Sequence, residues 1–165
     1  MTNSATTPVD SFYAPVEDAH IILDALSTEQ YCAKPTSPFK SSIGEHIRHI
    51  LDHYHALMLG LDAGHVDYNQ RTRQSNVESD LALAISNWQQ INDWLSSLND
   101  TDHERVVKVV TEHNIVNSTL GRELSFVSSH AVHHFAFIKL LASAFEVALP
   151  KDVGVAPATL KSQQP

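Results

Sequence analysis

The stretch that decides the fold of this 165-residue chain is FVSSHAVHHFAFIKLLASAF, residues 126–145. Its apolar side chains recur every three or four positions, a spacing that predicts one face of a long helix. His130 and His134 are four residues apart, so on a helix they lie one above the other on the same face. Two imidazoles in this arrangement can bind one metal ion.

A second histidine-rich stretch, SIGEHIRHILDH, occupies residues 42–53 and also has apolar side chains at helical spacing. Together with residues 126–145 it holds six of the eleven histidines in the chain. The rest of the sequence is therefore interpreted as the scaffold that brings these two helices together.

Apolar periodicity predicts four long helices, at residues 16–26, 43–61, 77–98 and 121–147. Ser41 or Ser42 can cap the second helix, and Gly64 follows its end. Ile85 and Trp88 keep the period of the third helix and are expected to face the core. Four amphipathic helices predict a mainly all-α fold, the four-helix bundle, and bundles build metal sites in their cores.

Two segments interrupt the helical pattern. β-branched runs at residues 105–110 and 115–119 flank a short polar turn, which predicts a small β-hairpin before the last helix. Residues 65–76 are polar and lack a period, so they are interpreted as a long crossover. This crossover is either a solvated connection or a loop that contacts an anionic substrate through Arg71 and Arg73.

Length and composition are those of one domain. The chain is 42% apolar, enough to bury a core without the help of a disulfide. The predicted domain spans residues 1–165, with a helical core at about 15–147 and a flexible tail at 1–10. Residues 153–160 are apolar enough to pack against the bundle.

Charge and composition exclude several classes of function. A net charge of −8, with scattered lysines and arginines, disfavours a nucleic acid or an anionic membrane as partner. No window reaches the roughly 18 continuous apolar residues of a membrane span, and the first ten residues do not resemble a signal peptide. The single cysteine, Cys32, fits a reducing compartment, so a cytoplasmic protein is expected.

The positions of the histidines around their helices indicate which of them can share an ion. His130 and His134 flank the apolar stripe of the last helix, whereas His133 lies well off it. On residues 43–61, His46 and His53 lie at the edge of the stripe, and His49 is rotated about 40 to 60° further from its centre. The helical wheel alone therefore selects His46 and His53.

Two interpretations of the histidines compete. Each imidazole could simply bond a nearby carboxylate or carbonyl group. An i, i+4 pair in one helix and an i, i+3, i+7 set in another instead favour a metal site, because neutral imidazole is the commonest metal ligand near pH 7. Imidazoles suit Zn, Ni or Fe better than Mg or Ca.

Three short motifs carry a family resemblance: SIG at residues 42–44, HILD at 49–52 and HAVHH at 130–134. They resemble the DinB-like superfamily of metal-binding four-helix bundles. In that family one histidine of the second helix and an HxxxH pair of the last helix bind a divalent metal, with water in the open positions. The resemblance implies that His49, His130 and His134 are the ligands.

The resemblance also implies a reaction class. Three neutral imidazoles leave the ion its charge and open positions, which can activate water or stabilise a thiolate. Because characterised members of the family include thiol transferases, the resemblance implies that this chain is a thiol S-transferase that uses a low-molecular-weight thiol. One alternative is a metal-dependent hydrolase with Glu45, Asp52 or Glu123 as proton acceptor. The other is a non-catalytic metal-binding or stress-response module.

The sequence suggests few partners for this protein. A catalytic pocket would be lined by Tyr68, Arg71, Arg73 and Arg122, which suit an anionic small molecule. The expected partners are therefore a small-molecule substrate or thiol and a second copy of the chain in a homodimer. No nucleic acid or membrane partner is expected.

Overall fold

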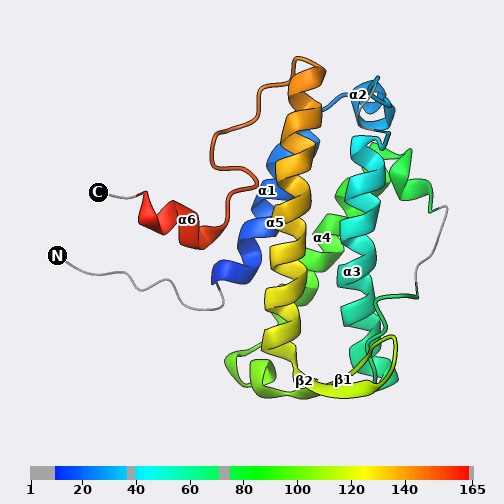
Figure 1. Cartoon of the computed structure of the whole chain (residues 1–165), viewed down its shortest axis with the longest axis vertical. Coiled ribbons are helices and arrows are strands. Elements are labelled where there is room, and N and C mark those ends of the chain that lie inside the picture. Colours follow the sequence, from blue (N-terminus) through cyan, green and yellow to red (C-terminus); the bar gives the residue numbers. More distant parts are fainter. Residues whose placement is uncertain (1–9, 37–39, 71–74, 164–165) are drawn as a thin grey trace.

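The computed structural model describes residues 10–36, 40–70 and 75–163, and four long helices within them form a bundle (Figure 1). These helices are α1 (Asp10–Asp24), α3 (Ile43–Ala63), α4 (Leu81–Ser97) and α5 (Leu120–Ala144). The predicted fold class, a mainly helical four-helix bundle, is confirmed. Of the tail predicted at residues 1–10, residues 1–9 lie outside the described residues.

Helix α1 begins earlier than the sequence predicted, at Asp10 instead of residue 16, and runs through Pro15. A proline inside a helix removes one backbone hydrogen bond. The extra turns place Phe12 on the same face as Val16, and Phe12 is only 8% exposed. Burying a phenyl ring contributes about 1.5–3 kcal/mol, which offsets much of the cost of the proline.

A short helix that the sequence did not predict, α2 (Thr28–Cys32), follows α1. Ser27 Oγ accepts a hydrogen bond from the Gln30 amide at 3.2 Å, and Gln30 Oε1 accepts one from the Ser27 amide at 2.9 Å. This reciprocal pair is a capping box. Tyr31 is fully buried, and its hydroxyl donates to the Val77 carbonyl at 2.6 Å.

Helix α3 begins where the sequence predicted and ends two residues beyond the predicted boundary. Ser42 Oγ accepts a hydrogen bond from the Glu45 amide at 3.1 Å, and Glu45 Oε2 accepts one from the Ser42 amide at 2.7 Å. This capping box fixes the first turn. Gly64 ends the helix with a φ of 83°, a conformation that glycine adopts without steric cost.

The third predicted helix, residues 77–98, is divided in two. A 3₁₀ turn, η1 (Asn76–Glu78), precedes α4. The Asp80 side chain accepts a hydrogen bond from a backbone amide in the first turn of α4, and this cap sets the start of the helix. Trp88 is fully buried as predicted, whereas Ile85 lies at the edge of the buried face and is 38% exposed.

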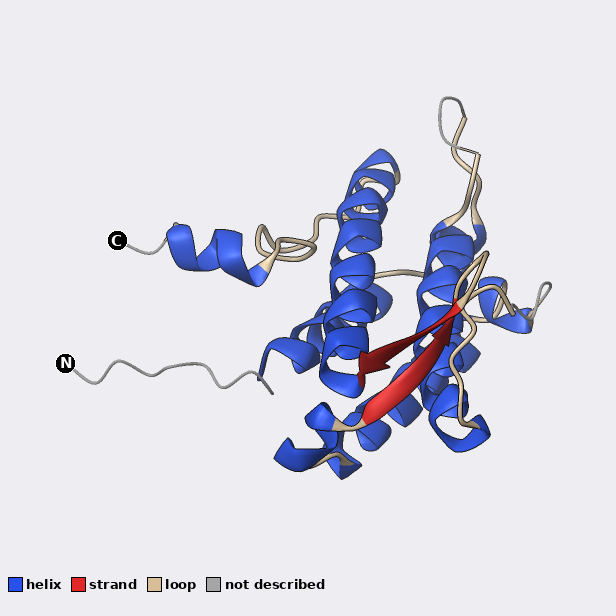
Figure 2. Cartoon of the chain, turned by 60° about the horizontal axis from the view of Figure 1, so that its bottom comes forward, coloured by secondary structure: helices blue, strands red, loops and turns tan. Residues whose placement is uncertain are grey.

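The predicted hairpin is confirmed, because β1 (Val106–Val110) pairs antiparallel with β2 (Ile115–Thr119) (Figure 2). A 3₁₀ turn, η2 (Asp100–Glu104), precedes it. The crossover pairs with the edge of β1 that β2 leaves open. The Val66 amide donates to the Lys108 carbonyl at 2.7 Å, and the Val110 amide donates to the Val66 carbonyl at 2.8 Å. The hairpin closes one end of the bundle and holds the start of the crossover there (Figure 1).

Helix α5 ends at Ala144 instead of about residue 147. The apolar segment 153–160 packs on the bundle at Val153, which is 2% exposed. Residues 157–160 of that segment belong to α6 (Pro157–Ser162), which has no buried residue and extends away from the bundle (Figure 2). The packing prediction for residues 153–160 therefore holds at Val153 and at Gly154, whose amide donates to Asp18 at 3.0 Å, whereas α6 buries no residue.

The arrangement of α3 and α5 positions the candidate site. The two helices lie side by side (Figure 1), and fully buried residues such as Ile50 of α3 and Phe135 of α5 form the core beneath them. Polar side chains at the outer edge of this contact face each other across the seam. Among the described residues, no helix combines the length and apolarity that crossing a membrane requires.

Candidate metal centre

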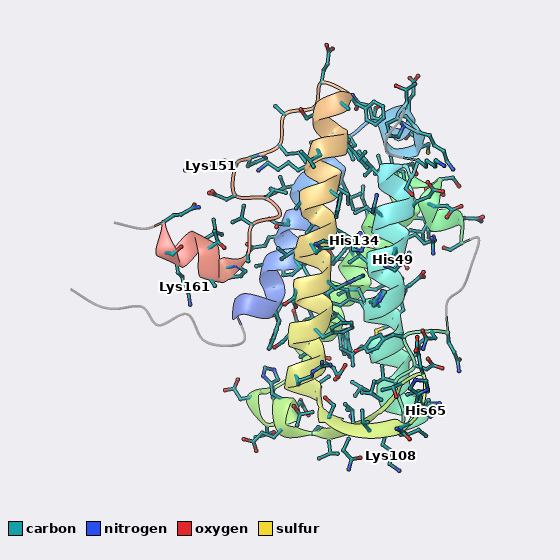
Figure 3. The ribbon with its side chains drawn as sticks, viewed as in Figure 1. His49, His65, Lys108, His134, Lys151 and Lys161 are labelled. Atoms are coloured by element: carbon teal, nitrogen blue, oxygen red, sulfur yellow. The ribbon has the colours of Figure 1, made fainter. Side chains whose placement is uncertain are left out.

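Five histidines meet in the seam between α3 and α5. Their rings make a connected series of contacts with centroid separations of 4.1 to 5.3 Å. The members of this cluster are His46, His49 and His53 from α3, and His130 and His134 from α5. Figure 3 shows His49 and His134 between the two helices.

His49, His130 and His134 form the centre of the cluster. Their donor nitrogens all lie within 4.8 Å of one another, and all three residues are half-buried. The Nε2 atoms of His49 and His130 are 3.1 Å apart. Ligand bonds of about 2.0–2.1 Å in a tetrahedral Zn site put neighbouring nitrogens about 3.3 Å apart, so this spacing fits a shared ion.

His46 and His53 flank the central three residues. The Nδ1 atom of His46 lies 3.0 Å from Nδ1 of His134. His53 Nδ1 lies 2.9 Å from the His49 carbonyl oxygen, and its ring centroid lies 4.1 Å from that of His130. The helical wheel selected these two histidines to share an ion, and neither is in the group whose donor nitrogens converge.

The remaining histidine of α5, His133, is exposed, consistent with its predicted position well off the apolar stripe. Its ring packs edge-on against Phe137 with a centroid separation of 5.1 Å, and against His134 at 5.6 Å. The structure therefore separates His133 from the converging nitrogens.

Three imidazoles of the cluster have pKa values below the ordinary value for histidine. Burial, together with the neighbouring histidines, lowers the pKa of His130 to about 3 and the pKa of His134 to about 4. Burial also lowers the pKa of His46. A neutral imidazole offers a lone pair, so these groups need not lose a proton before they bind a metal.

A buried carboxylate, Glu123, lies at the hairpin end of the seam. Its side chain is 1% exposed and accepts three hydrogen bonds: from the Tyr68 hydroxyl at 2.8 Å, from the Ser118 hydroxyl at 2.6 Å and from Arg122 at 2.8 Å. The Tyr68 ring stacks on His53 with a centroid separation of 5.6 Å. Burial raises the pKa of the Tyr68 hydroxyl, and Glu123 raises it further.

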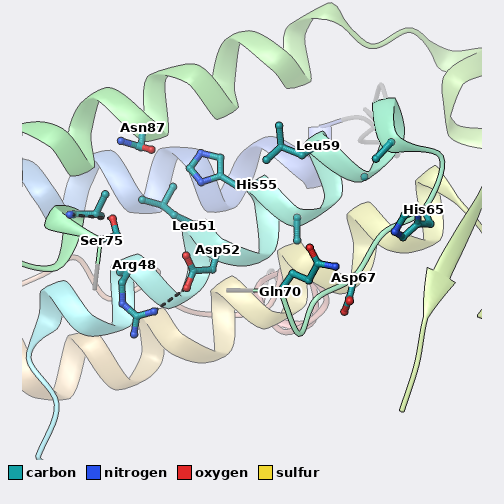
Figure 4. Close-up of a pocket in the computed structure, with 14 residues that line it drawn as sticks. Arg48, Leu51, Asp52, His55, Leu59, His65, Asp67, Gln70, Ser75 and Asn87 are labelled. Carbon is teal, nitrogen blue, oxygen red and sulfur yellow. Dashed lines mark hydrogen bonds and ion pairs between the residues drawn. The ribbon is translucent and has the colours of Figure 1, made fainter. Parts of the chain in front are cut away.

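Asp52, one of the predicted proton acceptors, is engaged in an ion pair. It pairs with Arg48 at 2.8 Å, and Arg48 also binds Glu78 at 2.9 Å. Asp52 and His55 line a cavity of about 300 Å³ between α3, α4 and the crossover (Figure 4). Burial raises the pKa of Asp52, and Arg48 opposes this shift.

Four other residues predicted for the site are engaged elsewhere or lie outside the described residues. Glu45 caps α3 and pairs with Lys34 at 3.1 Å. Arg122, with a side chain that is 64% exposed, pairs with Glu123 and lies 5.5 Å from the Phe126 ring centroid. Arg71 and Arg73 lie outside the described residues.

The fold and the histidine cluster define a class of protein, a helical bundle with a candidate metal centre between two of its helices. The chain belongs to the DinB superfamily, because the model of that family matches residues 15–138. The matched range includes α3, the hairpin and α5 beyond His134.

Two solved structures from Bacillus subtilis have similar folds. One is the DinB-like protein YjoA, with a TM-score of 0.65 and 20% identity over 88% of this chain and 96% of that chain. The other is YfiT, described as a probable metal-dependent hydrolase with an unusual four-helix bundle topology. Its TM-score is 0.61, with 15% identity over 90% of this chain and 94% of that chain.

One curated protein shares a short stretch with this chain. It is FK506-binding protein 5 of Rhizopus delemar, which is 43% identical over 44 residues. This stretch is 27% of the present chain and 11% of the fungal protein. The similarity therefore covers a small part of that relative.

Proposed function

We propose that this protein is a divalent-metal-dependent enzyme acting on a small molecule, with His49, His130 and His134 as the ligands of the ion. The observation that carries the proposal is the convergence of three imidazole nitrogens within 4.8 Å in a half-buried seam. The donor set is all nitrogen, which suits Zn or Ni, and also Fe, better than Mg or Ca.

A divalent ion bound there would supply a positive charge and open coordination positions, which lower the pKa of a nucleophile. The protein's own residues organise the surroundings. His53 packs between His130 and Tyr68, and Glu123 fixes the Tyr68 hydroxyl. In this arrangement His53 is only 6% exposed.

The reaction class we propose is transfer of a low-molecular-weight thiol to a small electrophile. A thiol ordinarily has a pKa near 8.5, so a nearby positive charge suffices to ionise it without a protein base. The three carboxylates considered as bases, Glu45, Asp52 and Glu123, are each paired with other groups. That pairing favours a nucleophile that needs no carboxylate.

Metal-dependent hydrolysis is the second candidate, supported by the likeness of the fold to YfiT. In this reaction an activated water would attack the substrate. A non-catalytic metal-binding module is the third interpretation, and it predicts metal uptake without turnover.

One experiment separates these candidates. The protein loaded with Zn or Ni would be incubated with glutathione, or another small thiol, and 1-chloro-2,4-dinitrobenzene, and in parallel with a p-nitrophenyl ester. We expect conjugation that disappears in the metal-free protein and in His134→Ala. Ester hydrolysis without conjugation would establish the hydrolase instead, and metal binding without either reaction would establish the binding module.

The setting we propose is the cytoplasm, with the protein as a homodimer. Cys32, the only cysteine in the sequence, is half-buried, and its thiol lies 3.4 Å from the Ser79 carbonyl, which suits a compartment that keeps thiols reduced. Light scattering of the purified protein tests the assembly. A mass near 18.3 kDa, that of a single chain, would contradict the homodimer.

A further inference from the structure

His46 and His134 make a contact that the three-ligand site does not require. Their Nδ1 atoms lie 3.0 Å apart, and the residues are 88 positions apart in the sequence. Two neutral imidazole nitrogens at this distance form a hydrogen bond when one carries a hydrogen and the other carries a lone pair. The two rings therefore have opposite protonation at the atoms that meet.

We propose that His46 is a positioning residue that accepts a hydrogen bond from Nδ1–H of His134 and so directs the bare Nε2 of His134 toward the metal. This inference rests on the proposed metal centre. It assigns a role to a side chain that the helical wheel would have used as a ligand.

The direction of the hydrogen bond follows from the requirements of a ligand. A nitrogen that binds a metal cannot keep a proton. His49 and His130 approach each other through their Nε2 atoms, whereas Nδ1 of His134 is already in contact with His46. The nitrogen of His134 left for the ion is Nε2, so its proton must reside on Nδ1. Outer partners of this kind fix the orientation of a metal-binding ring.

The surroundings of His46 fit a fixed acceptor. Its ring is parallel to that of Phe137, with an interplanar angle of 2° and a centroid separation of 6.2 Å. Phe137 is 37% exposed although it follows the fully buried Phe135 by only two residues. Its phenyl ring lies at the exposed edge of α5 beside His46, where it can hold the imidazole in plane.

The geometry favours a positioning role over a fourth ligand. The group whose donor nitrogens lie within 4.8 Å of one another contains His49, His130 and His134, and His46 is not a member. His53 differs from His46 because its Nδ1 contact is with a backbone carbonyl of its own helix. The Nδ1 atom of His46 instead contacts a ring on the other helix, that of His134 on α5.

Nitrogen NMR of the histidine rings tests this assignment without any assay of activity. Long-range proton–nitrogen spectra of the ¹⁵N-labelled, metal-free protein distinguish a protonated ring nitrogen from a bare one. We expect His134 to be protonated at Nδ1 and His46 to be protonated at Nε2. The loss of signals in His46→Ala and in His134→Ala assigns the two rings.

Zn titrations of three variants supply the second readout. His46→Ala should mix the two protonation forms of His134 and weaken Zn binding by about 10- to 100-fold, the usual effect of losing an orienting partner. In His46→Asn the amide oxygen can accept the same hydrogen bond, so binding should return to within a few-fold of the wild type. His133→Ala, at the exposed neighbour, should change neither property.

Three results would overturn the inference. One is a wild-type His134 protonated at Nε2, a measurement that needs no variant. The second is unchanged Zn affinity in His46→Ala. The third is a large shift of a His46 nitrogen on Zn addition, which would make His46 a fourth ligand. If the wild type takes up no metal yet His134 is protonated at Nδ1, the proposed function fails while the hydrogen-bond direction is supported.

Discussion

The Nε2 atoms of His49 and His130 lie 3.1 Å apart although the two residues are separated by 81 positions in the sequence. The contact depends on the packing of α3 against α5, and that packing rests on apolar residues below the seam, among them Ile50 and Phe135. The core therefore sets the distance between the two imidazoles. Because the core positions the helices and the histidines are proposed to bind the ion, stability and metal binding can be tested separately.

The protein should stay folded without metal. Buried apolar residues come from all four long helices, so the core does not depend on the histidines. Chelation should lower the melting temperature, because a ligand at 100 times its dissociation constant contributes about 2.7 kcal/mol. Helical circular dichroism should persist at room temperature. Collapse of the helical signal on chelation would instead make the ion a structural element.

Acidification should destabilise the metal-free protein. The pKa values of His130 and His134, at about 3 and about 4, are below the value of about 6.5 expected in the unfolded chain. Their contribution is complete above about pH 6.5, and below it the unfolded chain binds more protons, so the free energy of unfolding falls as the pH falls toward 4.

Urea unfolding at about pH 7.5 and about pH 5 measures this dependence. The double variant His130→Gln, His134→Gln is the matched control, because glutamine does not titrate. Its free energy of unfolding should change less between the two pH values. An identical change in the wild type and the double variant would show that other groups cause the pH dependence.

Removal of the Tyr68 hydroxyl should weaken the hairpin end of the bundle. Glu123 is buried and takes one of its three hydrogen bonds from this hydroxyl. Tyr68→Phe should lower the free energy of unfolding by about 1–3 kcal/mol, because a buried carboxylate loses a donor. Tyr13→Phe is the control, since the Tyr13 hydroxyl has no hydrogen bond within the described residues. Equal stability of the two variants would contradict the role assigned to Tyr68.

A methyl group at Gly44 should not fit. A Cβ there would collide with the Glu78 carbonyl oxygen and lie 2.8 Å from the Tyr31 ring. Overpacking costs about 1–3 kcal/mol, more than the roughly 0.5–1 kcal/mol that alanine contributes over glycine in a helix. Gly44→Ala should therefore be less stable than the wild type in urea. At Gly121 an added Cβ would lie 3.2 Å from its nearest neighbouring atom, so Gly121→Ala should lose less stability than Gly44→Ala.

The local signals in the sequence account for most of what could be predicted. The start of helix α3 matched its prediction and its end lay within two residues, because Ser42 and Gly64 mark the ends by short-range chemistry. The start of α1 was missed because the burial of Phe12, a tertiary contact, outweighs the local penalty of Pro15. Helix α2 had a readable signal in Ser27 and Gln30, whose spacing is that of a capping box.

The site was harder to predict than the fold. The helical wheel describes a helix with one buried face, yet α3 contacts both α4 and α5, so its seam with α5 lies off the centre of the apolar stripe. For this reason the wheel favoured His46 and His53 over His49. The pairing of Glu123 with Tyr68 depends on where the crossover lies, and residues 65–76 have no period that could reveal it.

The most direct test of the central claim is a competition titration of Zn against a chromophoric chelator. We predict that the wild type binds about one equivalent of Zn. His49→Ala, His130→Ala and His134→Ala should each lower the Zn affinity by more than the roughly 100-fold expected when an orienting partner is lost. The Zn affinity of His133→Ala should stay within a few-fold of the wild type. Full Zn affinity in His49→Ala, together with its loss in His53→Ala, would contradict the account, as would a wild-type protein that binds no metal.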